Sequence, residues 1–162
     1  MANSTSASLK LTVQATGENS GTWGQITNTN LLILEQAIGG YDTFNVTNAN
    51  RALTFTNGAV SNGKNEVIKL TGTITGNQIV TVPDSIEKVF IVTNGTSGAF
   101  TVQFKTASGT GITFGVSEKT TRLVYSDGTN LVDAGFGGSL DIEGRELVLD
   151  ADGDTTLTAD TD

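Results

Sequence analysis

The stretch from Thr16 to Gly40 limits the possible folds most, because it holds the only tryptophan and the one convincing helical pattern of the chain. Thr22 and Gln25 have the spacing of a capping box, and the glycines at the end of the stretch are typical of a helix C-terminus. The sequence therefore predicts one helix over residues 22–38. Its apolar residues at helical spacing are Trp23, Ile26, Ile33, Leu34, Ala37 and Ile38.

The predicted helix carries more apolar surface than one small domain can cover. Leu31 and Leu32 widen the apolar face until it occupies most of the second half of the helix. A helix that is apolar on nearly every side is buried on nearly every side. We therefore expect one face to pack on the chain's own β-domain and the other to meet another chain. The alternative is a plain core helix that lies across a sheet.

The rest of the chain has the composition of a β-protein with many tight turns. Apolar residues make up 36% of the 162 residues, charged residues make up 16%, and there are 20 glycines and one proline, Pro83. Threonine favours a pleated surface, whereas glycine and asparagine favour turns. This composition predicts a single small domain with extensions.

From Tyr41 to about residue 135 the apolar residues alternate in short runs that turn signals separate. Asn57–Gly58 and Asn94–Gly95 are among the dipeptides that predict tight turns. Seven to nine short strands of this kind predict a mainly β fold. We expect an antiparallel β-sandwich with jelly-roll-like or Greek-key crossings, and with one N-terminal helix.

Residues 1–15 predict an N-terminal arm that contains a short strand. Leu9, Leu11 and Val13 alternate with polar residues, as in a half-buried strand. A lone strand needs a partner, which could be the main sheet, a neighbouring copy or the exposed edge of another protein. We expect Leu9, Leu11 and Val13 to anchor the arm.

Residues 136–162 begin as a glycine-rich hinge and continue as short apolar bursts among acidic residues. The bursts are too short to build a core from one chain. Copies wound about a common axis would bury Leu147, Leu149 and Leu157 and leave the acids in water. This segment therefore predicts the start of an extended fibrous β-shaft.

Charge and composition exclude several classes of function. The net charge is −8, with only nine lysines and arginines, so we expect no nucleic-acid partner. The absence of cysteine and histidine removes the usual thiolate and imidazole chemistry, and we expect neither an enzyme nor a cofactor. No run approaches the roughly 20 apolar residues of a membrane span, and the N-terminus is unlike a signal peptide.

The remaining candidate sites are weak. Asp150, Asp152 and Asp154 have the one-three-five spacing of a calcium loop, but Thr155 and Thr161 replace its diagnostic glycine and glutamate. We therefore expect no metal site there and favour a solvated acidic face. A carbohydrate-binding site would need exposed aromatic side chains beside polar groups. The candidates for that role are Tyr41, Phe114 and Phe136.

Three segments carry a family likeness. The stretch from Gly17 to Gly24, continued through Leu34–Ile38, and the Tyr125–Asn130 hairpin resemble the N-terminal part of tail fibres and related tail proteins of marine podoviruses and myoviruses. The segment Leu147–Asp162 resembles the one that comes after that domain in such fibres. The resemblance covers nearly the whole chain. It implies a homotrimer, made in the host cytoplasm and placed in the virion tail, whose N-terminal region docks onto adaptor or nozzle proteins of the tail.

These observations combine into one hypothesis, a structural virion protein at the tail-proximal end of a fibre. Residues 1–15 would be the anchoring arm, 16–40 the loop and helix, 41–135 the β-domain, and 136–162 the hinge and shaft start. The expected trimer contacts are Trp23, Ile26, Ile33, Leu34, Leu147 and Leu149. The alternatives are a ring-type or neck-type accessory tail protein and a sugar-binding β-domain.

Overall fold

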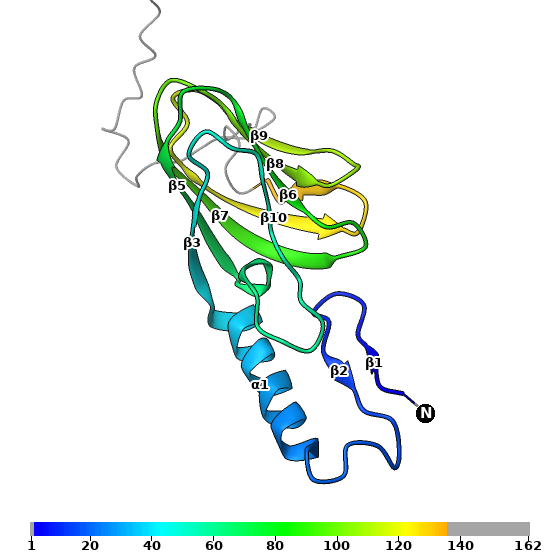
Figure 1. Ribbon diagram of the computed structural model, residues 1–162. Coiled ribbons are helices and arrows are strands. Elements are labelled where there is room, and N and C mark those ends of the chain that lie inside the picture. The colour runs from blue at the N-terminus through cyan, green and yellow to red at the C-terminus, as the bar shows by residue number, and fades with distance from the viewer. Residues whose placement is uncertain (1, 136–162) are drawn as a thin grey trace, which may run out of the picture.

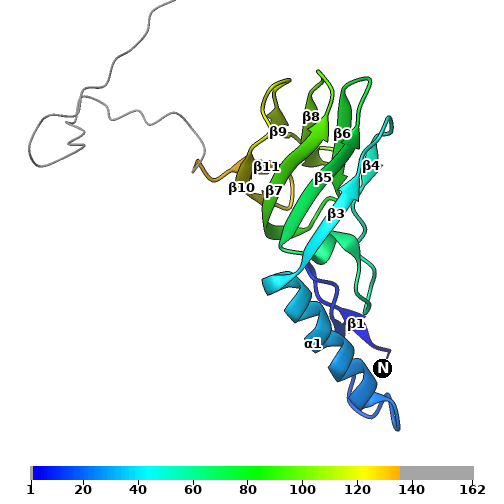
Figure 2. The ribbon, with the colours of Figure 1, turned by 90° about the vertical axis from the view of Figure 1, so that its left-hand side faces the viewer.

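The computed structural model describes residues 2–135, which form a mainly β body with one helix at its end. The helix α1 (Trp23–Gly39) confirms the predicted helix to within a residue at each end. It projects away from the body and does not lie across a sheet, as Figure 1 and Figure 2 both show. The alternative of a plain core helix is therefore wrong.

The ends of α1 differ from the expected caps. The Thr22 hydroxyl donates to the Asn19 carbonyl, and no side chain caps the first turn. At the other end Gly40 has φ −72°, so the helix ends in extended backbone without a left-handed residue. Glycine is required at position 40 for space, because a Cβ there would lie 2.2 Å from the Gln36 carbonyl oxygen.

Two short strands precede the helix. β1 (Ser4–Thr5) pairs antiparallel with β2 (Thr12–Val13), and together they form the N-terminal hairpin, residues 4–13. The hairpin lies alongside α1 (Figure 1). The predicted lone strand thus finds its partner within its own chain, in residues that the sequence analysis assigned to an arm.

The body consists of two sheets. The first has the order β11 (Leu131–Asp133), β10 (Thr121–Asp127), β7 (Glu87–Ser97), β5 (Val67–Thr73) and β3 (Tyr41–Asn45). The second has the order β4 (Arg51–Ala52), β6 (Gln78–Val82), β8 (Val102–Thr106) and β9 (Gly111–Phe114). A short 3₁₀ helix, η1 (Asn62–Lys64), lies between β4 and β5.

The sheets are mixed, and four of the seven strand pairs that these two sheets contain are parallel. From β3 to β8 each strand is followed by one in the opposite sheet, so the chain winds as a coil whose turns stack in parallel. The strands β9, β10 and β11 then add antiparallel pairs. The expectation of a wholly antiparallel arrangement was therefore wrong.

Asparagine side chains connect successive turns of this coil. The Asn50 side chain accepts from the backbone N–H of Ile79 at 2.8 Å, and Asn77 does the same for Thr101 at 3.1 Å. Each pair lies at equivalent positions in adjacent turns, just before a strand begins or within its first residues. The asparagines thus satisfy backbone donors at the corners, where strand pairing stops.

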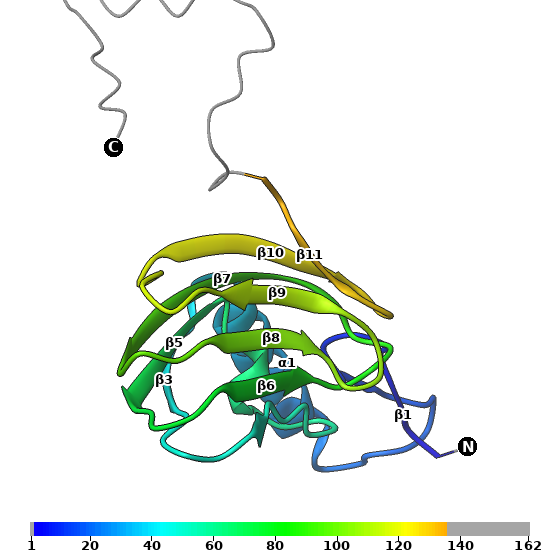
Figure 3. The same cartoon turned by 90° about the horizontal axis from the view of Figure 1, so that it is seen from above.

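The two sheets enclose one hydrophobic core, and Figure 3 shows them as facing layers. Phe90 from the first sheet and Phe104 from the second meet edge to face, with ring centroids 5.7 Å apart. Most of the buried apolar side chains come from alternate strand positions, as the period-two pattern predicts. The core therefore stabilises the β-body without any apolar contribution from the exposed face of α1.

Candidate self-association surface

The exposed face of α1 is the most unusual surface of the described residues. Ile33 is the one buried residue of the helix. Trp23 is 64% exposed, Leu34 is 37% exposed and Ile38 is 73% exposed. Large apolar side chains that remain in water on one element usually mark a contact with another molecule.

Part of the outer face of α1 follows a heptad spacing, although Trp23 and Leu32 are exposed outside it and its first member, Thr27, is half-buried. Thr27, Leu31, Leu34, Ile38 and Tyr41 are separated by steps of four, three, four and three, and we call this row the seam. The spacing places the four members on α1 at successive d and a positions of a coiled coil. The last member, Tyr41, lies beyond the helix as the exposed first residue of β3, the edge strand of the first sheet.

The seam is almost free of charge. Glu35 is the one ionisable side chain between Trp23 and Gly39. The first turn has no acid and the last turn has no base. Copies of this helix would therefore meet with little like-charge repulsion, even though the net charge of the whole chain is −8.

A groove of about 530 Å³ lies at the C-terminal end of α1 and meets the seam at Tyr41. Leu32, Val60 and Tyr41 supply its apolar wall, and Glu35 supplies its one charged side chain. A hydrogen bond of 3.3 Å from the Ser61 N–H to the Gln36 side chain ties the loop that carries Val60 to the helix. The groove therefore has a defined wall.

The predicted contact residues divide into three groups. Trp23 and Leu34 are exposed and Ile26 is half-buried, so all three retain surface for a partner. Ile33 has no exposed surface and packs within its own chain, so its assignment to the trimer interface was wrong for the chain as the structure describes it. Leu147 and Leu149 lie outside the described residues.

The predicted anchoring residues are on the N-terminal hairpin. Leu9 and Leu11 are half-buried, whereas Val13 is 50% exposed. The Asn30 side chain on α1 holds the backbone of Thr12 by two hydrogen bonds of 2.9 Å. The hairpin is therefore attached to the helix through its second strand.

A buried lysine shapes the loop next to the hairpin. Lys64 has no exposed surface, and its Nζ donates to the carbonyl oxygens of Thr56 at 2.7 Å and Ala59 at 2.5 Å. Burial and the nearby charge of Lys10 lower the pKa of Lys64. The two hydrogen bonds of the buried lysine thus hold the backbone of the 56–59 turn in place.

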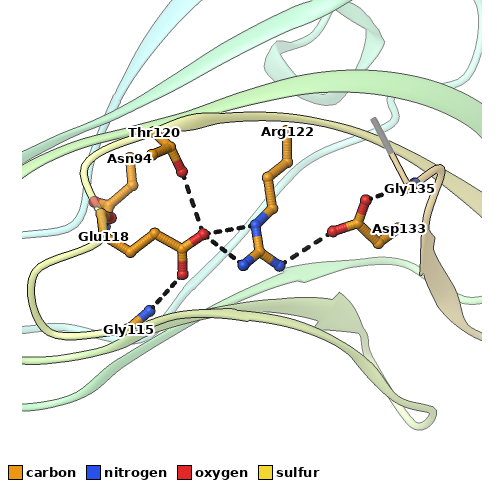
Figure 4. Close-up of polar contacts among 7 residues, drawn as sticks. All are labelled: Asn94, Gly115, Glu118, Thr120, Arg122, Asp133 and Gly135. Carbon is orange, nitrogen blue, oxygen red and sulfur yellow. Dashed lines mark hydrogen bonds and ion pairs between the residues drawn. The ribbon is translucent and has the colours of Figure 1, made fainter. Parts of the chain in front are cut away.

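A charged network lies on β10 and the segments next to it (Figure 4). The Arg122 guanidinium binds the Glu118 carboxylate through Nε and Nη2 and donates to Asp133 at 3.1 Å. Partial burial raises the pKa of Glu118, but the N–H of Gly115 and the charge of Arg122 outweigh it, so this pKa lies below its ordinary value. The network joins the β9–β10 loop to β11.

Leu31, Ile38 and Tyr41 were not predicted to belong to one row. Grouping the apolar residues by a period of 3.6 hides the four-three spacing of a heptad, and Tyr41 lies beyond the helix. Lys64 was not predicted either, because the sequence does not distinguish a buried lysine from an exposed one.

Within residues 2–135 no group of three or more acidic side chains is arranged to hold a metal ion, and the aspartates 150, 152 and 154 lie outside that range. The same range contains no helix with the length and apolarity of a membrane span. No family model, curated protein or solved structure matches this chain.

Proposed function

We propose that this chain is a structural, non-enzymatic virion protein, the tail-proximal N-terminal part of a phage tail fibre. It assembles as a homotrimer through the seam and docks the fibre onto adaptor or nozzle proteins of the tail. It is made in the host cytoplasm and resides in the virion tail. The exposed heptad row on α1 is the observation that carries the proposal.

The seam supports self-association because it has the spacing of a coiled-coil contact and carries almost no charge. In a single chain Leu31 and Ile38 leave large apolar side chains in water, and a second and third copy of α1 would cover them. The number of copies comes from the resemblance to tail fibres. The heptad row itself requires only that more than one helix is present.

The other parts take roles that fit their positions. The N-terminal hairpin, with Val13 exposed, contacts the tail. The β-body acts as a spacer and collar, and the expected shaft contacts Leu147 and Leu149 lie outside the described residues. The chain has no histidine and no cysteine, which fits a structural protein better than an enzyme.

Light scattering of the 162-residue chain tests the proposal. We expect the mass of three copies, and a monomer at micromolar concentration would contradict it. A larger closed ring would favour a ring-type accessory tail protein instead. Among the aromatic residues considered for sugar binding, Phe114 is buried, Tyr41 belongs to the seam and Phe136 lies outside the described residues, so we expect a glycan array to stay blank.

A further inference from the structure

Three Asn–Gly pairs lie in the described residues, at 57–58, 62–63 and 94–95. In such a pair the backbone nitrogen of glycine can attack the asparagine side-chain carbonyl, because glycine has no side chain to obstruct it. The reaction needs a free glycine N–H and an asparagine side chain that can turn toward it. The three pairs differ in both respects.

Two of the pairs are held in place. Asn94 is 1% exposed, and its amide donates to the Glu118 carbonyl at 2.7 Å while its carbonyl accepts from Thr96. The Asn62 side chain accepts twice from Thr54, and the Gly63 N–H donates to the Thr54 carbonyl. Both asparagines are therefore fixed by contacts inside the β-body and the loop beneath it.

The third pair is protected only by the N-terminal hairpin. Asn57 is exposed, and the Gly58 N–H donates to the Lys10 carbonyl at 2.7 Å. Gly58 has φ +59°, and a Cβ on it would lie 2.4 Å from the Thr12 hydroxyl oxygen, so the turn contacts the hairpin closely.

The hairpin has the features of a locally unstable unit. Each of its strands has two residues. A two-stranded hairpin is marginal by itself, and terminal segments open more easily than the core does. Opening of the hairpin breaks the bond to Lys10 and frees the Gly58 N–H, while Lys64 still holds the turn by the carbonyls on either side.

We propose that Asn57–Gly58 is a self-modification site that hairpin opening controls. The Gly58 nitrogen bonds to Cγ of Asn57, and the Cγ–Nδ2 bond breaks. Ammonia leaves and takes up the proton of the Gly58 N–H. Water then opens the cyclic imide to an aspartyl or isoaspartyl residue at position 57. This inference does not depend on the proposed function.

The modification would act back on the hairpin. The isoaspartyl form inserts one extra carbon into the backbone directly before Gly58, the residue that contacts Lys10 and Thr12. Each product also adds a negative charge to a turn that surrounds the Lys64 ammonium group. We expect the isoaspartyl product to hold the hairpin open, so that ageing of the protein releases the N-terminal segment irreversibly.

The experiment incubates the folded chain at mildly alkaline pH and measures conversion at each asparagine by mass spectrometry. Asn57 and Asn62 lie between Arg51 and Lys64, on one tryptic peptide, so fragment ions compare them directly. We expect position 57 to convert about tenfold faster than positions 62 and 94 in the folded chain. In the isolated peptide, positions 57 and 62 should convert at similar rates.

Asn30→Ala removes both hydrogen bonds from α1 to Thr12, and Asn28→Ala on the same helix is the matched control. We expect Asn30→Ala to raise the rate at position 57 about tenfold and to leave positions 62 and 94 unchanged. Hydrogen exchange at the Gly58 amide should rise by a similar factor. An unchanged rate at position 57 despite faster exchange would overturn the proposal, as would equal conversion at the three positions in the folded wild-type chain.

Discussion

The Asn30 side chain makes two hydrogen bonds to the backbone of Thr12. Its Oδ1 accepts from the Thr12 N–H and its Nδ2 donates to the Thr12 carbonyl, each at 2.9 Å. This is the pairing that a neighbouring strand would offer, but an amide on a helix supplies it here. It explains how a hairpin of two-residue strands stays against α1.

The first prediction concerns charge on the seam. Leu31→Glu places a carboxylate at an exposed a position, where association would bury it beside copies of itself. We expect the proposed oligomer to dissociate into monomers that keep the β-body's thermal unfolding temperature. Light scattering and circular dichroism measure the two effects. Val116→Glu, which is also exposed but lies on the β-body, should leave the mass unchanged.

The second prediction concerns the direction of the helices. The chain has no cysteine, so single variants give a clean disulfide readout. If copies meet in parallel and in register, Leu31→Cys and Ile38→Cys should each form same-residue disulfides under mild oxidation. An antiparallel arrangement would instead cross-link a mixture of the two variants. Non-reducing gels distinguish the outcomes, and Val89→Cys, exposed on the first sheet, is the control.

The third prediction compares two glycines of the helix region. At Gly40 an added Cβ would lie 2.2 Å from the Gln36 carbonyl oxygen and 2.5 Å from the Asn65 side chain, whereas at Gly24 it would meet nothing within 4 Å. Gly40→Ala should therefore lower the free energy of unfolding by about 2 kcal/mol or more. Gly24→Ala should raise it by up to about 1 kcal/mol, because alanine favours helix. Urea unfolding measures both, and equal effects would contradict the argument.

Local patterns predicted the elements of the fold well. The helix was found because apolar residues at a period of 3.6 run for four turns, and most strands were found because alternation is a local signal. The sequence could not distinguish parallel from antiparallel neighbours. Alternation is the same in both, and a chain that crosses to the opposite sheet after each strand needs no long connection to form parallel pairs.

Two particular residues show where local reasoning stops. Asn94–Gly95 predicts a turn but lies inside β7, because the buried Asn94 side chain bonds to Glu118 and Thr96 and both residues pair with β5. Ile33 and Leu34 are adjacent and both apolar, yet one is buried and the other is exposed. Which of the two side chains is buried depends on which face of α1 the hairpin and the β-body cover.

The fourth prediction concerns the network of Figure 4. Arg122→Gln removes the group that binds both Glu118 and Asp133, and leaves two half-buried carboxylates without their cation. We expect a loss of about 1–3 kcal/mol of stability and faster hydrogen exchange in residues 115–120 and 131–134. Arg51→Gln is the control, since Arg51 stacks on Phe44 and makes no ion pair within residues 2–135. Equal losses in the two variants would contradict a special role for the network.

The fifth prediction concerns pH. Burial lowers the pKa of Lys88 to about 8, against a smaller opposing effect of the Glu66 carboxylate. The Lys88 ammonium lies 4.4 Å above the Phe90 ring and donates to the carbonyls of Asn65 and Val89. Since the unfolded chain holds this proton up to the ordinary lysine pKa of 10.5, it binds more protons than the folded chain between about pH 8 and 10.5.

The free energy of unfolding should therefore rise with pH across that window as the folded chain loses the Lys88 proton. Below the window the buried ammonium group destabilises the folded chain to its full extent. The slope stays under about 1.4 kcal/mol per pH unit, because the side chain keeps some contact with water. Urea unfolding of the wild type and of Lys88→Met, measured across the window, gives the difference that isolates this residue from the other ionisable groups of the chain. Lys69→Met, half-buried on β5, is the matched control for the loss of a lysine side chain from a strand. A constant difference between wild type and Lys88→Met would mean that the folded and unfolded chains bind this proton alike.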